Sequence, residues 1–323
     1  MINQYSSTSA YSARPASLKA FLFFLLLATC LTAQAQSDTY RKGQYLEPAY
    51  EGWWKNDDGT FSFIFGYQNE NWEEELDIPV GENNQFSPGN ADRGQPTHFL
   101  PRRNRFTFEV VVPADWGDKE LAWTVTAHGV TKVAYATLAR DYVVDSVVIA
   151  SETGSLGAGT SSPESRANIA PVVTVLGDRT GDQITRRVRV GEPLMIEAKV
   201  DDDGLPKIRA ASLTRATLEG REKMLKPPTQ VTVGKTNGLF LSWNVYRGDG
   251  AVAFDPPQIK PWEDTRAGAN SPWGALWTPP LVPEDGIYKT EVTFDKPGTY
   301  VLWGRADDGG LYHDEFITVI VSE

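Results

Sequence analysis

Residues 105–110 read RFTFEV, so polar and apolar side chains alternate along this stretch. Residues 60–65, TFSFIF, follow a similar pattern. A repeat of two is typical of a β-strand that buries one face and leaves the other in solvent. We find no convincing amphipathic helix around these stretches, so residues 36–150 are predicted to form a β-sandwich.

Two turns support this interpretation. The alternating stretches 121–125 and 133–138 flank His128-Gly129, which we interpret as a hairpin turn. Residues 57–59, Asp-Asp-Gly, precede the Phe-rich stretch, and an Asp-Gly pair supplies the positive φ that a tight hairpin needs. Both features favour antiparallel strands joined by short connections.

Two other segments are predicted to lie outside regular strands. Residues 81–94 are polar and rich in Gly and Asn, with Phe86 as their main apolar residue, which indicates a long surface loop. Residues 151–168 are mostly Ser, Gly, Thr, Ala and Glu, a composition that cannot bury a core and is typical of a linker. We therefore predict a domain boundary there, followed by a second β domain over residues 169–323.

Several segments of the second domain together resemble a known fold. They are RVGEPL (189–194), VDDDG (200–204), LSWNV (241–245), FDKPGTYVL (294–302) and FITVIV (316–321). In that order they look like the early strands, the tryptophan-bearing strand, the PGTY strand and the closing strand of an immunoglobulin-like or PKD-like β-sandwich. The resemblance implies that Trp243 is the core tryptophan between the sheets and that Tyr300 holds the corner before its strand. The disulfide of antibody domains is absent.

The predicted fold class is therefore all-β, with two β-sandwich domains in tandem. The second domain carries a long insertion rich in Trp and Pro, over residues 249–286. The first domain resembles a segment of uncharacterised exported bacterial proteins, which implies no activity. Because a fold does not determine a function, neither resemblance supplies catalytic residues.

The first 35 residues have the layout of a secretory signal peptide. Arg14 and Lys19 precede an apolar run at residues 20–28, and the motif AQA at residues 33–35 fits a cleavage site. The apolar run is much shorter than the about 20 residues that a transmembrane helix needs. We predict export to the periplasm or the extracellular space, with no transmembrane segment.

The single cysteine of the chain, Cys30, lies in this N-terminal segment. The mature protein is therefore predicted to hold no disulfide and no metal-thiolate site. Residues 27–30, LATC, resemble a lipobox, so membrane anchoring through an acylated Cys30 is the alternative. Thr29 fits that motif poorly, because a small Gly, Ala or Ser usually occupies its position.

Charge excludes several classes of partner. The net charge of the chain is −11, and removal of Arg14 and Lys19 with the signal peptide makes it more negative still. Such a surface repels phosphate backbones and anionic lipid headgroups, so we expect no nucleic-acid partner. The basic stretch 102–105, RRNR, is interpreted as a charged strand start that discourages edge pairing, with an anion site as the alternative.

No local pattern indicates a catalytic or metal site, and we predict no cofactor. His98, His128 and His313 are scattered without the spacing of a zinc site or a triad. The acidic runs 201–203 and 307–308 each precede glycine and are interpreted as solvated turns. Calcium bound between loops is the alternative, although the alternating order of a calcium loop is missing.

The insertion provides the most specific candidate ligand site. Aromatic rings can stack on sugar rings while neighbouring polar groups bind the hydroxyls. The residues of this type are Trp262, Trp273, Trp277, Asp264, Arg266 and Asn270. The alternative is that the tryptophans pack the insertion onto its own sandwich.

The functional prediction is an exported, non-catalytic binding or structural protein, with contact to carbohydrate or the cell surface as its most specific form. The partner would be a polysaccharide or a cell-envelope protein. One alternative is a protein-interaction module of an envelope assembly. The other is a hydrolase that uses Glu73 or Glu74 with Asp201, and it would need two carboxylates facing each other across a cleft.

Overall fold

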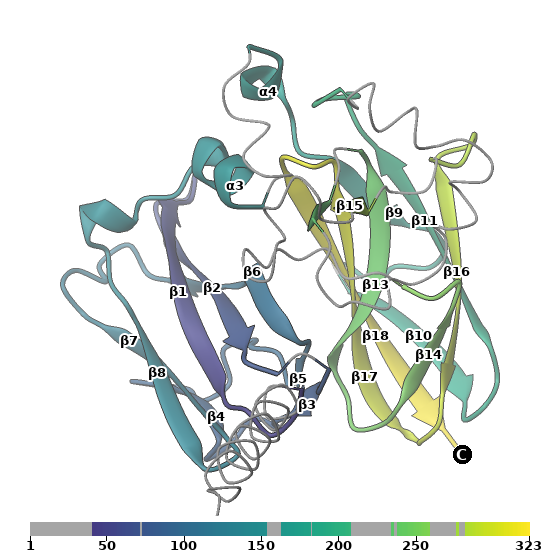
Figure 1. Ribbon diagram of the computed structural model, residues 1–323, viewed down its shortest axis with the longest axis horizontal. Helices are drawn as coiled ribbons and strands as arrows, with labels where there is room; N and C mark the ends of the chain where they lie inside the picture. Colours follow the sequence, from purple (N-terminus) through teal and green to yellow (C-terminus); the bar gives the residue numbers. More distant parts are fainter. Residues whose placement is uncertain are drawn as a thin grey trace, which may run out of the picture.

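The computed structural model describes residues 41–71, 73–153, 163–181, 183–207, 234–235, 238–258, 276–277 and 282–323. Strands dominate these residues and pack as several sheets, so the predicted all-β class is confirmed (Figure 1). The helical segments are short: η1 (Arg140–Tyr142), α3 (Ser146–Thr153) and α4 (Pro163–Ala167). Within the described ranges no helix has the length and apolar character to cross a membrane. The predicted signal peptide lies outside them.

The N-terminal half contributes eight strands, which we call the N-terminal module. They are β1 (Leu46–Lys55), β2 (Phe61–Asn69), β3 (Leu76–Asp77), β4 (Asn84–Ser87), β5 (His98–Phe99), β6 (Arg102–Val112), β7 (Leu121–Ala127) and β8 (Val130–Ala136). They form the sheets β1-β2-β6 and β4-β7-β8 and the pair β3-β5, all antiparallel.

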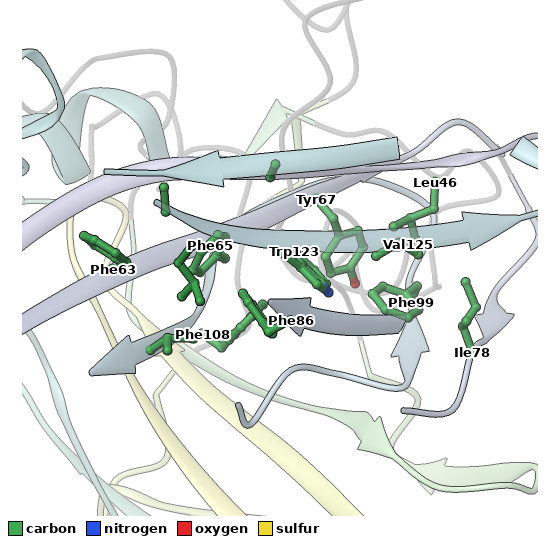
Figure 2. Packing of buried hydrophobic residues seen from close by; sticks show 14 of the residues in the cluster. Leu46, Phe63, Phe65, Tyr67, Ile78, Phe86, Phe99, Phe108, Trp123 and Val125 are labelled. Atoms are coloured by element: carbon green, nitrogen blue, oxygen red, sulfur yellow. The ribbon is translucent and has the colours of Figure 1, made fainter. Parts of the chain in front are cut away.

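Trp123 of β7 lies at the centre of the core of this module (Figure 2). Its ring is stacked on Phe86 at 5.8 Å and meets Phe108 edge-on at 5.0 Å, and Phe65 lies edge-on at 5.8 Å. The sequence interpretation of residues 81–94 as a surface loop was wrong for β4. Phe86 is 2% exposed, because β4 pairs with β7 and brings its ring against Trp123.

The two predicted hairpin turns are confirmed. His128 (φ 48°) and Gly129 (φ 77°) join β7 to β8, and two successive positive φ values are what a two-residue hairpin turn requires. Gly59 (φ 86°) lies in the turn between β1 and β2. There the Asp58 carboxylate accepts hydrogen bonds from the backbone and hydroxyl of Thr60.

The C-terminal half contributes strands β9 to β18, the C-terminal module. They are β9 (Val172–Val175), β10 (Ile184–Arg189), β11 (Leu194–Asp201), β12 (Gly234–Lys235), β13 (Phe240–Arg247), β14 (Val252–Asp255), β15 (Leu276–Trp277), β16 (Ile287–Phe294), β17 (Gly298–Asp307) and β18 (Tyr312–Ser322). Two four-stranded sheets face each other, β14-β16-β11-β9 and β10-β18-β17-β13, and β12 pairs with β15. This is the strand order of an immunoglobulin sandwich, with β13, β17 and β18 as its C, F and G strands.

The residues assigned from the resemblance occupy the expected places. Trp243 of β13 is 1% exposed in the core between the sheets. A Cβ on Gly304 of the paired strand β17 would approach its ring to 2.6 Å, so only glycine fits there. Tyr300, at the start of β17, donates its hydroxyl hydrogen to the carbonyl of Lys296 at 3.0 Å. The predicted corner is therefore present.

Part of the predicted insertion belongs to the sandwich itself. Residues 252–255 form β14, which pairs with β16 as the edge of its sheet. Residues 151–153 and 163–167, in the predicted linker, are helical in α3 and α4. The sequence analysis missed α3 because its apolar residues form a continuous run, 147–150, instead of one helical stripe.

The corner hydrogen bond gives a first testable expectation. We expect Tyr300→Phe to lower the free energy of unfolding by about 1 kcal/mol, because it removes a single hydrogen bond and keeps the buried ring. Chemical denaturation of the parent and the variant measures this value. Tyr135→Phe, on the exposed face of β8, serves as the control and should leave stability unchanged. Equal losses in both variants would show that the Tyr300 hydroxyl has no structural role.

Candidate binding cleft at the module junction

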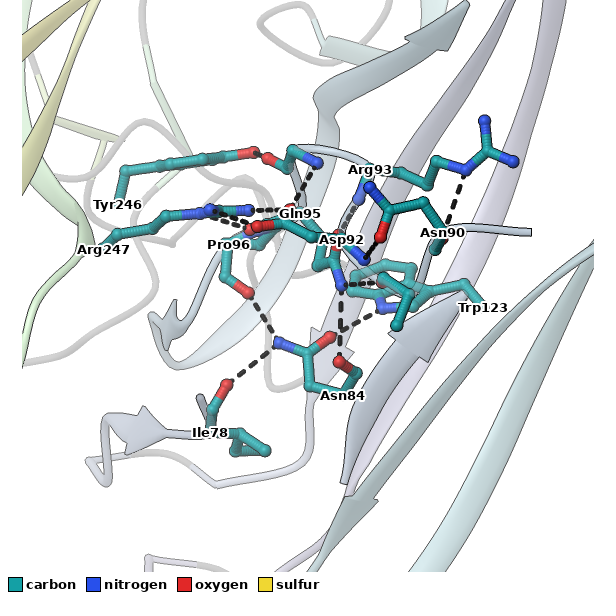
Figure 3. Close-up of polar contacts among 12 residues, drawn as sticks. Ile78, Asn84, Asn90, Asp92, Arg93, Gln95, Pro96, Trp123, Tyr246 and Arg247 are labelled. Carbon is teal, nitrogen blue, oxygen red and sulfur yellow. Dashed lines mark hydrogen bonds and ion pairs between the residues drawn. The ribbon is translucent and has the colours of Figure 1, made fainter. Parts of the chain in front are cut away.

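The two modules are joined by hydrogen bonds between β13 and the segment before β5 (Figure 3). The backbone N–H of Thr97 donates to the carbonyl of Tyr246 at 3.0 Å, and the Tyr246 hydroxyl donates to the carbonyl of Gly94 at 2.5 Å. Arg247 donates to both carboxylate oxygens of Asp92, at 2.8 and 3.1 Å. These hydrogen bonds from Arg247 hold the pKa of Asp92 below its ordinary value.

Asn84 fixes the shape of this segment from inside the N-terminal module (Figure 3). Its side-chain amide donates to the carbonyls of Ile78 and Pro96, and its oxygen accepts the indole N–H of Trp123 at 3.0 Å. Asn84 is 0% exposed, so these bonds form away from water. The aromatic core and the segment that contacts the C-terminal module are therefore positioned by the same side chain.

Arg305 of β17 makes the second polar connection. It is 5% exposed and forms two hydrogen bonds, both 2.7 Å, with its cross-strand partner Asp314 of β18. The same guanidinium donates to the carbonyls of Phe106 at 2.6 Å and Arg105 at 3.3 Å. Phe106 has a φ of 50°, which is unfavourable for a bulky residue, so Arg305 stabilises a strained part of β6.

Apolar packing accompanies these contacts. Tyr246 and Trp303 of the C-terminal module are buried members of the same hydrophobic cluster as Trp123. Val301 and Phe316 are partly buried against it. The outer face of the β13-β17-β18 sheet therefore continues the core of the N-terminal module, and the two modules form one packed unit.

A cleft of about 940 Å³ opens beside this junction. One wall carries three aromatic residues, Trp54 of β1, Phe106 of β6 and Tyr312 of β18. The rings of Phe106 and Tyr312 are stacked across the junction with centroids 6.3 Å apart. The start of α3, with Asp145 and Ser146, lies at the rim, where the Asp145 carboxylate accepts the N–H of Val148.

Three carboxylates, those of Glu109, Asp145 and Asp314, are among the polar groups that line the cleft. Glu109 of β6 is exposed and hydrogen-bonds with Ser62. Desolvation raises the pKa of Glu109 and the nearby charge of Asp314 adds to this, while the Ser62 hydrogen bond opposes it. His313 also lines the cleft, and its Nδ1 accepts the backbone N–H of Val173 at 3.2 Å. Its Nε2 therefore carries the hydrogen when the ring is neutral.

A second cavity, of about 620 Å³, lies between β5 and β13 and is lined by His98. The two ring nitrogens of His98 contact Asp77 at 2.7 Å and Glu75 at 3.0 Å. Burial by itself would lower the pKa of His98, but the hydrogen bonds to these carboxylates raise it overall. His98 is therefore held by two carboxylates of its own module.

The residues proposed for sugar binding are not placed by the structure. Trp262, Trp273, Asp264, Arg266 and Asn270 lie outside the described residues, and only the backbone of Trp277 is described, in β15. The proposed hydrolase pair is not supported. Glu73 and Glu74 contact Arg41 and His128 in the N-terminal module, whereas Asp201 pairs with Lys199 on β11.

The basic stretch 102–105 begins β6, an edge strand of the sheet β1-β2-β6, which agrees with the predicted charged strand start. Arg102 is 1% exposed and donates to the carbonyl of Glu70 at 2.7 Å, and Arg103 forms an ion pair with Glu51 at 2.6 Å. Arg102 and Arg103 therefore have partners within their own module, which disfavours the alternative of an anion site at these two side chains. Sequence alone gave no signal for this, because the partners lie more than 30 residues away.

Both acidic runs form turns, as predicted, but only residues 201–203 are solvated, because Asp307 and Asp308 are buried. Asp202 and Asp307 each accept a backbone N–H two residues ahead, from Gly204 and Gly309. Asp308 is 1% exposed and accepts hydrogen bonds from the N–H groups of residues 310 and 311 and from the Asn168 amide. Within the described residues, no group of three or more His, Cys, Asp or Glu side chains could hold a metal ion.

Comparisons with known proteins gave structural matches only. No family model and no curated protein matches the chain. A conjugative transposon lipoprotein from Bacteroides eggerthii is similar at 9% identity, 46% coverage of this chain, 95% of that chain and a TM-score of 0.25. A chimeric titin Z1Z2 is similar at 8% identity, with 87% coverage of this chain and 99% of that chain. The D00-D0 domain of intimin is similar at 11% identity, with 86% coverage of this chain and 100% of that chain. Both have a TM-score of 0.23.

The Arg305 contacts give a second expectation. We expect Arg305→Met to lower the free energy of unfolding by about 3 to 5 kcal/mol, because Asp314 and two carbonyls lose their shared donor inside the junction. Arg179→Met is the control, since its partner Glu315 forms an exposed pair worth at most about 1 kcal/mol. If denaturation experiments gave similar losses of unfolding free energy for Arg305→Met and Arg179→Met, the structural role of Arg305 would be contradicted.

Asp308 gives a pH-dependent expectation. Desolvation raises the pKa of Asp308 from 3.8 to about 7, so between these values the folded protein binds more protons than the unfolded chain. Its contribution to stability is therefore full below about pH 4 and is lost as the pH rises to about 7. We expect Asp308→Asn to remove this loss, because an amide at this position can still accept the same N–H groups.

The measurement is the free energy of unfolding at several pH values between 4 and 8. The advantage of Asp308→Asn over the parent should grow as the pH rises. Asp285→Asn, in an exposed turn where the side chain also accepts one N–H, should show no such trend. Parallel pH curves for the parent and Asp308→Asn would contradict this expectation.

Proposed function

We propose that this chain is an exported, non-catalytic recognition protein that binds its ligand in the cleft between the two modules. Export is supported by the signal-peptide layout of residues 1–35 and the module boundary by the composition of residues 151–168. The observation that carries the proposal is the cleft itself, whose walls come from both modules. Ligand sites are commonly concave, largely apolar and located where domains meet.

The junction supports binding because it gives the cleft a fixed shape. Arg305 and Arg247 connect the modules on either side of shared apolar packing. A site that is already formed does not have to be ordered when a ligand arrives, which lowers the cost of binding. Two of the three carboxylates that line the cleft have structural partners: Asp314 pairs with Arg305 and Asp145 caps α3. This arrangement favours recognition over catalysis.

The tryptophan-rich segment remains a second candidate. Trp262, Trp273 and Trp277, with Asp264, Arg266 and Asn270, supply the residue types of a carbohydrate surface. The segment lies in the sequence between β14 and β16 of the C-terminal module. We propose polysaccharide as the partner of this segment, and a cell-envelope protein as the alternative partner of the chain.

A retention experiment tests both candidates. Residues 36–323 are incubated with isolated cell envelopes and with insoluble polysaccharides, and the bound fraction is measured. We expect Ser146→Trp to reduce retention at least tenfold, because an indole at the rim fills the cleft. Ser322→Trp places the same ring on an exposed residue at the end of β18 and should retain parental binding.

The variant Trp262→Ala/Trp273→Ala/Trp277→Ala separates the two sites. Loss of retention in this variant alone would assign binding to the tryptophan-rich segment and show that the cleft proposal is wrong. Loss in Ser146→Trp alone would assign it to the cleft. Absence of retention by the folded parent on every preparation would count against a recognition function.

A further inference from the structure

We propose that the cleft binds an organic cation, that is, an ammonium or guanidinium group on an apolar stem. The inference rests on the proposed function and names the ligand class of the same site. It follows from three features of the cleft: its aromatic wall, one carboxylate without an ion pair, and the commitment of the nearby arginines to other partners.

The aromatic wall suits a positive charge. A cation within about 6 Å of a ring face is attracted by the negative potential of that face. The Tyr312 ring already holds one cation, because the guanidinium of Arg305 lies 3.8 Å from its centroid, and it is also stacked on Phe106, so Trp54 is the ring of this wall that a ligand cation would meet. Trp54 supplies the type of ring that binds cations most strongly, and its side chain is partly exposed.

Glu109 provides the opposite charge. Three carboxylates surround Tyr312 closely enough to influence its pKa: Asp314, Glu109 and Glu51. Asp314 is paired with Arg305 and Glu51 with Arg103. Among the described residues Glu109 forms no ion pair, and its recorded hydrogen-bond partner is Ser62. A ligand cation beside Glu109 would therefore complete a pair that the protein leaves open.

The other charged residues that line the cleft also favour a cationic ligand. Its lining includes the carboxylates of Glu109, Asp145 and Asp314 and one guanidinium, that of Arg247. Arg247 is bound to Asp92 and is not available to an anion. An anionic ligand would meet net repulsion, and a neutral ligand would leave the Glu109 carboxylate without a counter-charge.

The apolar lining sets the second property of the ligand. Val144, Ile149 and Leu311 lie beside the aromatic residues in the cleft. They can bury an aliphatic stem while the charged end meets Glu109 and the rings. A lysine or arginine side chain of a partner protein has this form, and so does a free polyamine. Both ligands present a cation on an aliphatic stem, so the experiment must distinguish a partner protein from a free polyamine.

Titration calorimetry with defined probes tests the proposal. The probes are N-acetyl-lysine N-methylamide, spermidine and the neutral isostere N-acetyl-norleucine N-methylamide, each titrated into residues 36–323. We expect both cations to bind at least tenfold more tightly than the neutral probe, because hydrogen bonds to charged groups are stronger than neutral ones. Tighter binding of the lysine derivative would indicate a protein partner, and tighter binding of spermidine a free polyamine.

Two substitutions locate the binding. Glu109→Gln keeps the size of the side chain and should weaken cation binding about tenfold, whereas Glu120→Gln removes the same charge from an exposed residue outside the cleft and should have no effect. Trp54→Leu should lower the affinity for the two cationic probes more than the affinity for the neutral probe. Circular dichroism confirms that each variant is folded.

The outcomes distinguish this inference from the proposed function. Equal affinity for the cationic and neutral probes, or equal effects of Glu109→Gln and Glu120→Gln, would overturn the cation assignment. If the cation assignment fails but Ser146→Trp still abolishes envelope retention, the recognition function stands without the cation assignment. Cation binding that depends on Glu109, with no retention on any envelope preparation, would support the ligand class and contradict the recognition function.

Discussion

The structure depends on one buried guanidinium, that of Arg305. Asp314 neutralises it from the neighbouring strand, and its remaining donors satisfy the carbonyls of Arg105 and Phe106 in the other module. A planar group with several fixed donors can serve a carboxylate and two carbonyls at once, which a lysine cannot do. This geometry explains how Phe106 keeps its unfavourable φ of 50° and why its ring meets Tyr312 across the junction.

The same region shows why the modules act as one unit. A tandem of independent sandwiches would present polar outer faces to each other, joined by a chain segment alone. Here Tyr246 and Trp303 project from the C-terminal sheet into the cluster that contains Trp123. The Tyr246 hydroxyl and the Arg247 guanidinium then satisfy the carbonyls of Gly94 and Gln95. Apolar burial and directional bonds at one interface give the cleft beside it a defined shape.

Local sequence patterns predicted the parts of the fold that local physics determines. The strand at residues 105–110, the turn at His128-Gly129 and the places of Trp243 and Tyr300 follow from strand periodicity, backbone sterics or the resemblance. The alternation itself is interrupted, because the irregular pairing of β6 puts Phe106 and Phe108 in different hydrophobic clusters. Phe86 was misassigned because a four-residue strand in a polar segment has too few positions to show a period. The junction could not be predicted, because its partners lie about 150 to 200 residues apart.

The charge of the cleft is a consequence of how the junction is built. Arg305, Arg247 and Arg103 each have an acidic partner in or beside the interface, so the bonds that join the modules and hold β6 use the nearby cations. Glu109 lies on β6, a strand whose course the Arg305 contacts fix, and it forms no ion pair with any residue that the structure describes. A ligand cation beside Glu109 would stabilise the charged form of this carboxyl. The interactions that give the cleft its shape therefore also give it a preference for positive charge.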